Sequence, residues 1–202
     1  MTRRRDIGTF FAGFASGALV IVLFLRIWGA IPESRAQVPT SADRKDEPAA
    51  PTSGIGLPIA GLRLESMLDT FDKERGGGKP HGATDIMAPR GTPVFAVESG
   101  TIRKLFLSKP GGVTIYQFDS NNAYCYYYAH LDRYAVGITE GKRVQRGDLI
   151  GYVGSSGNAD PDAPHLHFAI LELGPDKHWW EGTAINPFPL LVQTLQKQSQ
   201  NK

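Results

Sequence analysis

The sequence contains a single cysteine, Cys125, among its 202 residues. No internal disulfide can therefore form, and cysteine usage says nothing about the redox compartment. Cys125 lies in the strand-like run 124–128, and no local signature of a nucleophilic cysteine surrounds it. We therefore expect a small buried side chain at this position and no catalytic thiol.

A strong excess of charge of either sign is also absent. The formal net charge is +2 at pH 7, and residues 1–30 hold four arginines against one aspartate, so the rest of the chain carries a net charge of −1. A nearly neutral domain exerts no general attraction on the phosphates of DNA or RNA. We therefore expect no nucleic-acid partner.

Charged residues are missing from Ile7 to Leu25. As a helix this run would be about 28 Å long, close to the thickness of a bilayer core. Three arginines, Arg3 to Arg5, precede it, so the positive-inside rule places the N-terminus in the cytoplasm. Residues 1–30 thus predict a basic stub and a single-pass anchor in the inner (cytoplasmic) membrane, with the remainder periplasmic or extracytoplasmic. The alternative is a signal peptide cleaved after Ser34–Ala36, although this apolar run is longer than usual for one.

Two glycines in this run, Gly13 and Gly17, lie four residues apart. Small residues at this spacing are typical of membrane helices that pair. Glycine is also frequent in membrane helices that do not pair, so the pattern leaves open both a weak homodimer through this helix and a monomer.

The composition changes after the apolar run. Residues 31–53 contain four prolines, several alanines and mixed charges, with almost nothing to bury. This composition predicts a disordered linker. We expect a folded domain over residues 54–192 and a polar, frayed tail over residues 193–202.

Short strand-like runs separated by glycine turns fill the predicted domain. The clearest runs are Val94–Val97, Thr101–Leu107, Val113–Phe118, Ala123–Leu131, Leu149–Val153 and His165–Leu171. The spacing of apolar residues predicts one early helix, over Leu64–Phe71. Without an alternating series of long helices, the pattern favours a mainly β fold, an antiparallel sandwich or barrel, over a parallel α/β sheet.

Histidines are scarce, and the spacing of four of the five is informative. His165 and His167 alternate on one predicted strand, so both side chains point to the same face. His81 precedes Asp85 by four residues. A hydrolytic zinc site takes three protein ligands and leaves a fourth position open. His81, Asp85 and one histidine of the pair would complete such a set, but alternation alone cannot rank the two.

His130 lies at the end of a tyrosine-rich run. Strand alternation places it on the same face as Tyr124, Tyr126 and Tyr128. An isolated histidine usually has a structural role. Beside a metal-activated water it would be a candidate general base or a donor to a developing oxyanion. The fifth histidine, His178, lies outside this expected site.

Five short motifs in this order resemble the lysostaphin/LytM family of zinc metallopeptidases over roughly residues 57–190. They are His81-x-x-x-Asp85, Ala88-Pro89-Arg90-Gly91-Thr92-Pro93-Val94, Tyr128-Ala129-His130-Leu131, Gly147-Asp148-x-Ile150-Gly151-x-Val153-Gly154 and His165-Leu166-His167-Phe168. One departure is Ala83, where the family usually has glycine. Alanine at this position removes no metal ligand, so the departure affects only the conformation of the local turn.

The resemblance implies a compact antiparallel β-domain with a groove along one sheet and bacterial cell-wall peptides as substrates. It implies Zn²⁺ as cofactor, with His81, Asp85 and His167 as its ligands. By the same carry-over, His130 and His165 are the two catalytic histidines. The division of base and oxyanion roles between them stays open.

The expected function is therefore a membrane-anchored zinc endopeptidase that hydrolyses peptide bonds in peptidoglycan, in the cross-bridges. Three alternatives stay open. The first is a non-catalytic activator or scaffold of other wall hydrolases, which in this family goes with lost ligands. The second is a wall-binding module, and the third is a zinc amidase that cuts the amide between sugar and peptide.

Overall fold

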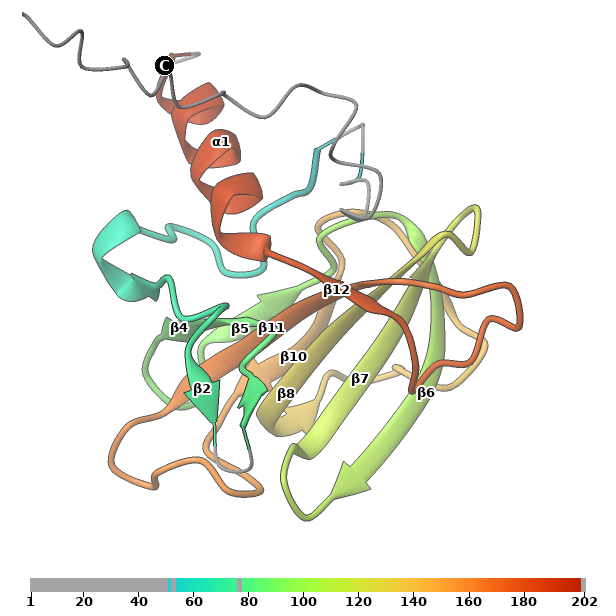
Figure 1. Ribbon diagram of the computed structural model, residues 1–202, viewed down its shortest axis with the longest axis horizontal. Helices are drawn as coiled ribbons and strands as arrows, with labels where there is room; N and C mark the ends of the chain where they lie inside the picture. The colour runs from blue at the N-terminus through green and yellow to red at the C-terminus, as the bar shows by residue number, and fades with distance from the viewer. Residues whose placement is uncertain (1–50, 52–53, 76–77, 201–202) are drawn as a thin grey trace, which may run out of the picture. The chain divides into compact units, whose positions relative to one another are not determined.

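The computed structural model of the protein describes residues 51, 54–75 and 78–200 (Figure 1). The predicted membrane helix and nearly all of the predicted linker lie outside these residues, so both stay predictions. Within the described residues, no helix is long and apolar enough to cross a membrane.

The described residues form a mainly β domain with one long helix. The strands are β1 (Met67–Leu68), β2 (Glu74–Arg75), β3 (Lys79–Pro80), β4 (Thr84–Met87), β5 (Pro93–Phe95), β6 (Gly100–Ser108), β7 (Gly112–Asp119), β8 (Tyr124–Tyr134), β9 (Arg143–Val144), β10 (Leu149–Val153), β11 (His165–Glu172) and β12 (Thr183–Ile185). A 3-10 turn, η1, covers Leu64–Ser66, and helix α1 covers Pro187–Gln200. All six predicted strands form, with ends within three residues of those expected.

Ten of these strands belong to one sheet, and β2 and β3 form a separate hairpin. The main path of the sheet is β1-β4-β11-β8-β7-β6-β9. Strand β10 joins β8 to β5, and β12 pairs with β11. Each of these pairings is antiparallel, as expected. The main sheet is thus a single branched sheet and not two separate layers.

The two faces of β8 have different surroundings because successive side chains point to opposite sides. Tyr126 and Tyr128 lie in the main core, with 1% and 0% of their surface exposed. The Tyr128 hydroxyl accepts from the backbone N–H of Val97 and donates to Gln117, so its polar end is satisfied. Cys125 packs on the other face, buried and without a disulfide, as predicted.

Helix α1 and residues 55–67 cover the core side of the sheet. Leu191 of α1 is fully buried in the same cluster as Ile55, Ile59 and Met67. The Thr194 hydroxyl donates to the Ile55 carbonyl over 2.7 Å, which links the helix to the start of the domain. The core therefore lies between this cover and one face of the sheet, and the opposite face of the sheet is called the groove face below.

Two local predictions were wrong. Residues 193–200, expected as a frayed tail, continue helix α1, because its apolar residues Leu191 and Leu195 pack on the core. The helix expected over Leu64–Phe71 is a 3-10 turn followed by β1. Met67 is buried and Leu68 is 47% exposed, as expected for alternating side chains on a strand. The helix does not form because β1 pairs with β4, and this pairing outweighs the helical spacing of the apolar residues.

We predict that Leu191→Ala lowers the free energy of unfolding by about 2–5 kcal/mol, because it leaves a cavity in the core. Leu107→Ala is the matched control. Leu107 is 72% exposed, so its truncation should change stability by less than about 0.5 kcal/mol. Urea titration followed by circular dichroism measures both. Equal effects of the two substitutions would contradict the packing of α1 on the core.

Candidate metal centre

Strands β4 and β11 lie side by side and set the centre of the site. Asp85 on β4 is directly opposite His167 on β11, and Met87 is opposite His165. His81 lies just before β4, where Gly82 has a φ of +66°. A positive φ is readily adopted by glycine, so the chain can turn there and bring the imidazole back over β4. Ala83 follows as a fully buried residue, so the departure from the family pattern is accommodated.

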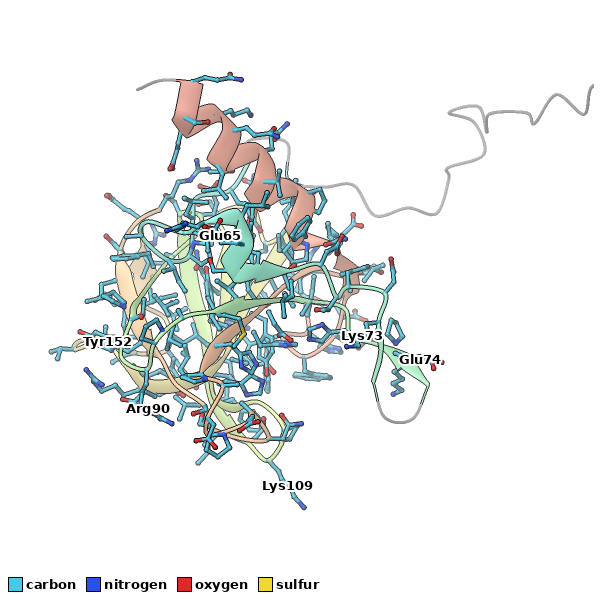
Figure 2. All side chains as sticks on the ribbon, turned by 90° about the vertical axis from the view of Figure 1, so that its left-hand side faces the viewer. Glu65, Lys73, Glu74, Arg90, Lys109 and Tyr152 are labelled. Carbon is cyan, nitrogen blue, oxygen red and sulfur yellow. The ribbon has the colours of Figure 1, made fainter. Side chains whose placement is uncertain are left out.

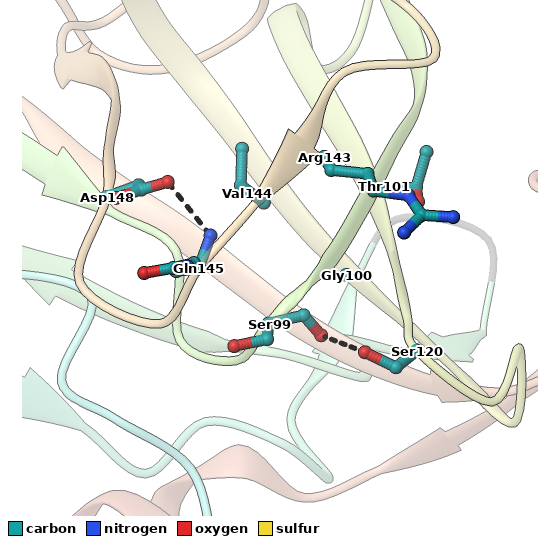
Figure 3. A pocket seen from close by; sticks show the side chains of 8 residues that line it. All are labelled: Ser99, Gly100, Thr101, Ser120, Arg143, Val144, Gln145 and Asp148. Carbon is teal, nitrogen blue, oxygen red and sulfur yellow. Dashed lines mark hydrogen bonds between the residues drawn. The ribbon is translucent and has the colours of Figure 1, made fainter.

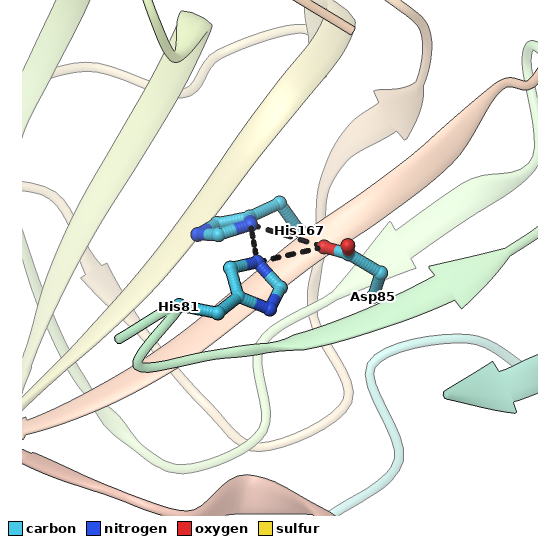
Figure 4. A group of neighbouring side chains, drawn as sticks. All are labelled: His81, Asp85 and His167. Carbon is cyan, nitrogen blue, oxygen red and sulfur yellow. Dashed lines mark hydrogen bonds and ion pairs between the residues drawn. The ribbon is translucent and has the colours of Figure 1, made fainter. Parts of the chain in front are cut away.

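Three donor atoms converge at this point (Figure 4). Nδ1 of His167 lies 3.0 Å from Oδ1 of Asp85 and 3.0 Å from Nε2 of His81. The Nε2 atom of His81 lies 3.3 Å from the same Oδ1. Ligand atoms held at 2.0–2.1 Å around a tetrahedral zinc are about 3.3 Å apart. The triangle of donors therefore has the size that a zinc ion requires.

The hydrogen-bond partners of His81 support the same conclusion. Its Nδ1 atom lies 3.2 Å from the carbonyl oxygen and 2.8 Å from the hydroxyl of Thr70. A carbonyl oxygen can only accept, so we assign the proton to Nδ1, which leaves a lone pair on Nε2. Lone pairs from His81 and Asp85 then face His167 at contact distance. Such a group is stable only around a shared proton or a cation, so the donor set fits a metal ion.

The charge of the Asp85 carboxylate strengthens this fit. Burial alone would raise the pKa of Asp85. The imidazoles of His167 and His81 hydrogen-bond to its carboxylate when protonated, and together they hold its pKa well below the usual range. Asp85 is therefore an anion at neutral pH. One negative ligand and two imidazoles form a typical zinc donor set.

His130 reaches the site through a β-bulge. Val113 pairs with Leu131 and Ile115 with Tyr128, so β8 advances three residues where β7 advances two. His130 itself has a φ of +58°, a conformation that costs a non-glycine residue about 1–2 kcal/mol. Bulges of this kind re-aim side chains and are common beside active sites.

The bulge corrects the predicted face of His130. Strict alternation would place it with Tyr126 and Tyr128, which point into the core. His130 instead lies on the opposite face, with ring centroids 4.9 Å from His165 and 5.6 Å from His167. The prediction from alternation failed because the extra residue in β8 moves the side chains that follow it to the other face of the sheet.

Ser156 holds the bulge and the ring of His130 together. Its hydroxyl accepts from the backbone N–H of Val113 and donates to the carbonyl of Leu131, so it bridges β7 and β8 where the ladder is interrupted. Its own carbonyl accepts from Nδ1 of His130 over 2.8 Å. A Cβ atom at Gly112 would collide with Ser156, so this close approach requires glycine.

His130 and His165 both hold their proton on Nδ1 and present Nε2 to the site. Nδ1 of His165 donates to the carbonyl of Ala163 over 2.8 Å, just as Nδ1 of His130 donates to Ser156. In each ring this leaves Nε2 with a lone pair. Burial lowers the pKa of His130 to about 4, and His167 and His165 act in the same direction, so His130 is neutral at pH 7.

A hollow of about 200 Å³ opens over this group of residues. Its lining consists of Pro80, His81, Pro110, Gly111, Tyr127, Ala129, His130, Asn158 and His167. Its lining joins Pro80 of β3 to Pro110 and Gly111 of the β6–β7 turn. Figure 2 labels Lys73, just before β2, and Lys109, in that turn. Three of the five histidines line this hollow, and the fourth, His165, lies beside His130 with ring centroids 4.9 Å apart. His178 lies apart in the β11–β12 loop.

A larger hollow, of about 620 Å³, lies at the β6–β9 edge of the sheet (Figure 3). Its polar groups are used locally: Asp148 accepts from the backbone N–H of Gln145, and the Ser120 hydroxyl donates to the carbonyl of Ser99. It contains no histidine, and no carboxylate besides that of Asp148. The smaller hollow, where the donors converge, is the candidate functional site.

Sequence reasoning missed two residues that support the site. Thr70 was placed within the expected helix, and no motif marks it as the partner of His81. Ser156 lies in the glycine-flanked segment 154–157 and resembles an ordinary turn residue. Each holds a histidine Nδ1 at its backbone carbonyl oxygen, which any residue type carries, so these two contacts have no signal in the sequence. The hydroxyl groups of both residues add further bonds, but no motif marks them.

The fold and the site together define a class of protein: an antiparallel β-domain with a histidine–aspartate metal centre in a hollow on one sheet face. The sequence model of Peptidase family M23 matches residues 79–187, more than half of the chain. The chain therefore belongs to peptidase family M23.

Comparison with individual proteins gives the same result. The chain is 36% identical over 121 residues to an L-Ala–D-Glu endopeptidase of Bacillus subtilis, covering 57% of this chain and 36% of that protein. It is 36% identical over 100 residues to the peptidoglycan DD-endopeptidase ShyC of Vibrio cholerae, covering 50% and 22%. A crystal structure of a zinc-containing peptidase from Vibrio cholerae superposes with a TM-score of 0.50 at 26% identity, covering 59% and 37%. The chain thus spans little more than a third, or less, of each of these proteins.

We predict that the purified protein binds one equivalent of zinc and that His167→Ala weakens this binding at least about 100-fold, because it removes one of three donors. His165→Ala should retain most of the zinc. Equilibrium dialysis with metal analysis measures this, and His178→Ala is the control for loss of a histidine outside the site. Equal zinc loss in the His165 and His167 variants would contradict the assignment.

Proposed function

We propose that this protein is a zinc-dependent endopeptidase that hydrolyses peptide bonds in bacterial peptidoglycan, in the cross-bridges. The observation that carries the proposal is the convergence of Nε2 of His81, Oδ1 of Asp85 and Nδ1 of His167 within 3.3 Å. His130 and His165 lie beside this group. Membership of peptidase family M23 supports peptide hydrolysis, and the names of the two relatives above support peptidoglycan as the substrate.

His81, Asp85 and His167 would hold the zinc ion, which when bound supplies Lewis acidity to polarise the scissile carbonyl and a water molecule. The protein contributes a preorganised set of ligands. Thr70 fixes the ring of His81, and the pairing of β4 with β11 fixes Asp85 against His167. The low pKa of Asp85 keeps the third donor anionic.

His130 and His165 would move the proton. Hydrolysis adds the oxygen of water to the carbonyl carbon, breaks the C–N bond and delivers a proton from water to the leaving amine. A histidine whose Nδ1–H is held by a carbonyl can accept that proton at Nε2 and pass it on. The protonated ring can also donate to the developing oxyanion. The two rings are near neighbours, so either role is open to each.

The alternative of a non-catalytic activator is less well supported. Proteins with that role in this family resemble the peptidases but have lost ligands, whereas here each expected ligand position carries a donor. A wall-binding module would need neither the donors nor the two additional histidines. An amidase would use the same site, and only the identity of the released fragments separates it from an endopeptidase.

We predict that the purified protein releases soluble fragments from peptidoglycan and that His130→Ala and His165→Ala each lower kcat by about 100-fold or more, because each removes a proton-transfer group. Zinc content should stay near the wild-type level in both variants. Mass spectrometry of the fragments identifies the bond, with Val136→Ala, a truncation at a fully exposed position, as the control. A folded, zinc-loaded wild-type protein that releases no fragment would overturn the endopeptidase proposal.

We also propose that residues 7–25 anchor the protein in the inner membrane, with the N-terminus cytoplasmic and the M23 domain periplasmic or extracytoplasmic. The support is the charge-free apolar run and the three arginines before it. A weak homodimer through Gly13 and Gly17 belongs to the same proposal. An enzyme of peptidoglycan would need its domain on this side of the membrane.

We predict that the full-length protein stays in the membrane fraction after alkaline carbonate extraction, whereas a variant lacking residues 1–30 appears in the soluble fraction of the cytoplasm. Protease added to spheroplasts should degrade the domain, because it is exposed outside. The mass of the mature protein is the decisive control. A mass that corresponds to cleavage after Ala36 would show that residues 1–36 are a signal peptide, and would contradict the anchor.

A further inference from the structure

The loop between β11 and β12 folds back over the groove face of the sheet and brings two tryptophans with it. Trp179 packs against a small second core formed by Phe118, Cys125 and Leu173. Its ring also contacts Phe106 of β6, with centroids 5.4 Å apart. The loop is therefore held on the same sheet face that carries the metal centre.

A row of aromatic rings connects the metal centre to this loop. The ring of His167 lies 5.9 Å from that of Tyr127, and Tyr127 lies 4.6 Å from Tyr116. Tyr116 lies 4.7 Å from Trp179, and Trp179 lies 5.2 Å from Trp180. Strands β8 and β7 supply the two tyrosines in register, since Tyr116 pairs with Tyr127. Each spacing is that of a direct ring contact, so the groove continues as one aromatic surface.

The row ends at an exposed platform beside a polar hollow. Trp180 is 59% exposed, and His178 stacks parallel to it with ring planes 8° apart and centroids 4.6 Å apart. The hollow has a volume of about 270 Å³, and its lining is Gly174, Pro175, Asp176, Lys177, His178, Glu181, Gly182 and Thr183. Lys177 has a φ of +53°, an uncommon conformation that concentrates at ligand-binding segments.

The charges of the platform help to identify its ligand. Asp176 and Glu181 line the hollow together with a single lysine, Lys177. The Lys177 ammonium group donates one bond to the carbonyl of Leu173, and the Glu181 carboxylate lies 3.3 Å from Nδ1 of His178, so each keeps capacity for one further bond. A peptide that carries free carboxylates would approach two acidic side chains, and the one ammonium group could not offset both. An uncharged ligand meets no such repulsion. It can lay an apolar face on an indole and use carboxylates and the ammonium group as hydrogen-bond partners.

We propose that the β11–β12 loop is a sugar-binding subsite that receives an N-acetylated sugar of the glycan strand while the attached peptide lies at the metal centre. The C–H face and acetyl methyl group of such a sugar are apolar and suit the ring of Trp180. Its hydroxyl and amide groups suit the side chains of Asp176, Lys177 and Glu181. The inference rests on the proposed action on peptidoglycan, whose repeating unit joins a neutral sugar to a charged peptide.

The first test measures sugar binding without hydrolysis. The probe is a peptide-free N-acetylglucosamine trimer, titrated into the full-length protein in detergent and followed by NMR. We expect saturable binding by the wild type. Trp180→Ala should weaken the affinity about tenfold, the size expected for one lost stacking contact, and Trp180→Phe should restore part of it. Val136→Ala, a truncation of a fully exposed apolar residue elsewhere, is the matched control. No binding by the wild type, or equal binding by Trp180→Ala, overturns the proposal.

The second test compares two substrates that share the same peptide, one with its disaccharide and one without. Trp180→Ala should raise KM on the sugar-bearing substrate about five- to tenfold more than on the free peptide. An equal rise on both would show that the platform receives peptide, and would overturn the sugar assignment. If the wild type cleaves neither substrate, the proposed endopeptidase function fails, and the binding titration still decides the sugar subsite.

Discussion

The antiparallel pairing of β4 with β11 is the constraint on which the site depends. It sets Asp85 opposite His167, and every other part of the centre is arranged around that pair. A shift of β4 by one residue along β11 would turn Asp85 towards the core and bring the apolar side chain of Ile86 to the site. The register is in turn fixed by the core, because Ile86, which follows Asp85, and Leu166, which precedes His167, are both fully buried. Packing and metal-ligand geometry are thus specified by the same alternation.

The second constraint is the bulge at His130, which works against regular strand geometry. Its positive φ is unfavourable, and the ladder between β7 and β8 is interrupted beside it. Ser156 compensates by bonding to both strands and to the imidazole of His130. A single serine therefore stabilises the irregular backbone and orients the ring that this backbone presents.

Much of this arrangement could be predicted from the sequence. Spacing predicted that His81, Asp85 and one histidine of the pair come together, and the family resemblance selected His167. Glycine-bounded apolar runs predicted six of the strands. The face of His130 could not be predicted, because alternation assumes regular pairing and an extra residue in one strand leaves no mark on composition. The helix expected from Leu64, Met67 and Leu68 failed because pairing with β4 outweighs local spacing. Helix α1 was not predicted, because most of its residues from Gln193 onward are polar and only a few apolar ones pack on the core.

The bond between Thr194 and Ile55 also determines where the domain can be joined to other segments. It brings the C-terminal helix and the beginning of the domain together on the core side of the sheet. The groove opens on the other face. A tether, tag or further domain attached at either position therefore joins the domain on the core side of the sheet, and the hollow at the metal centre stays on the opposite side.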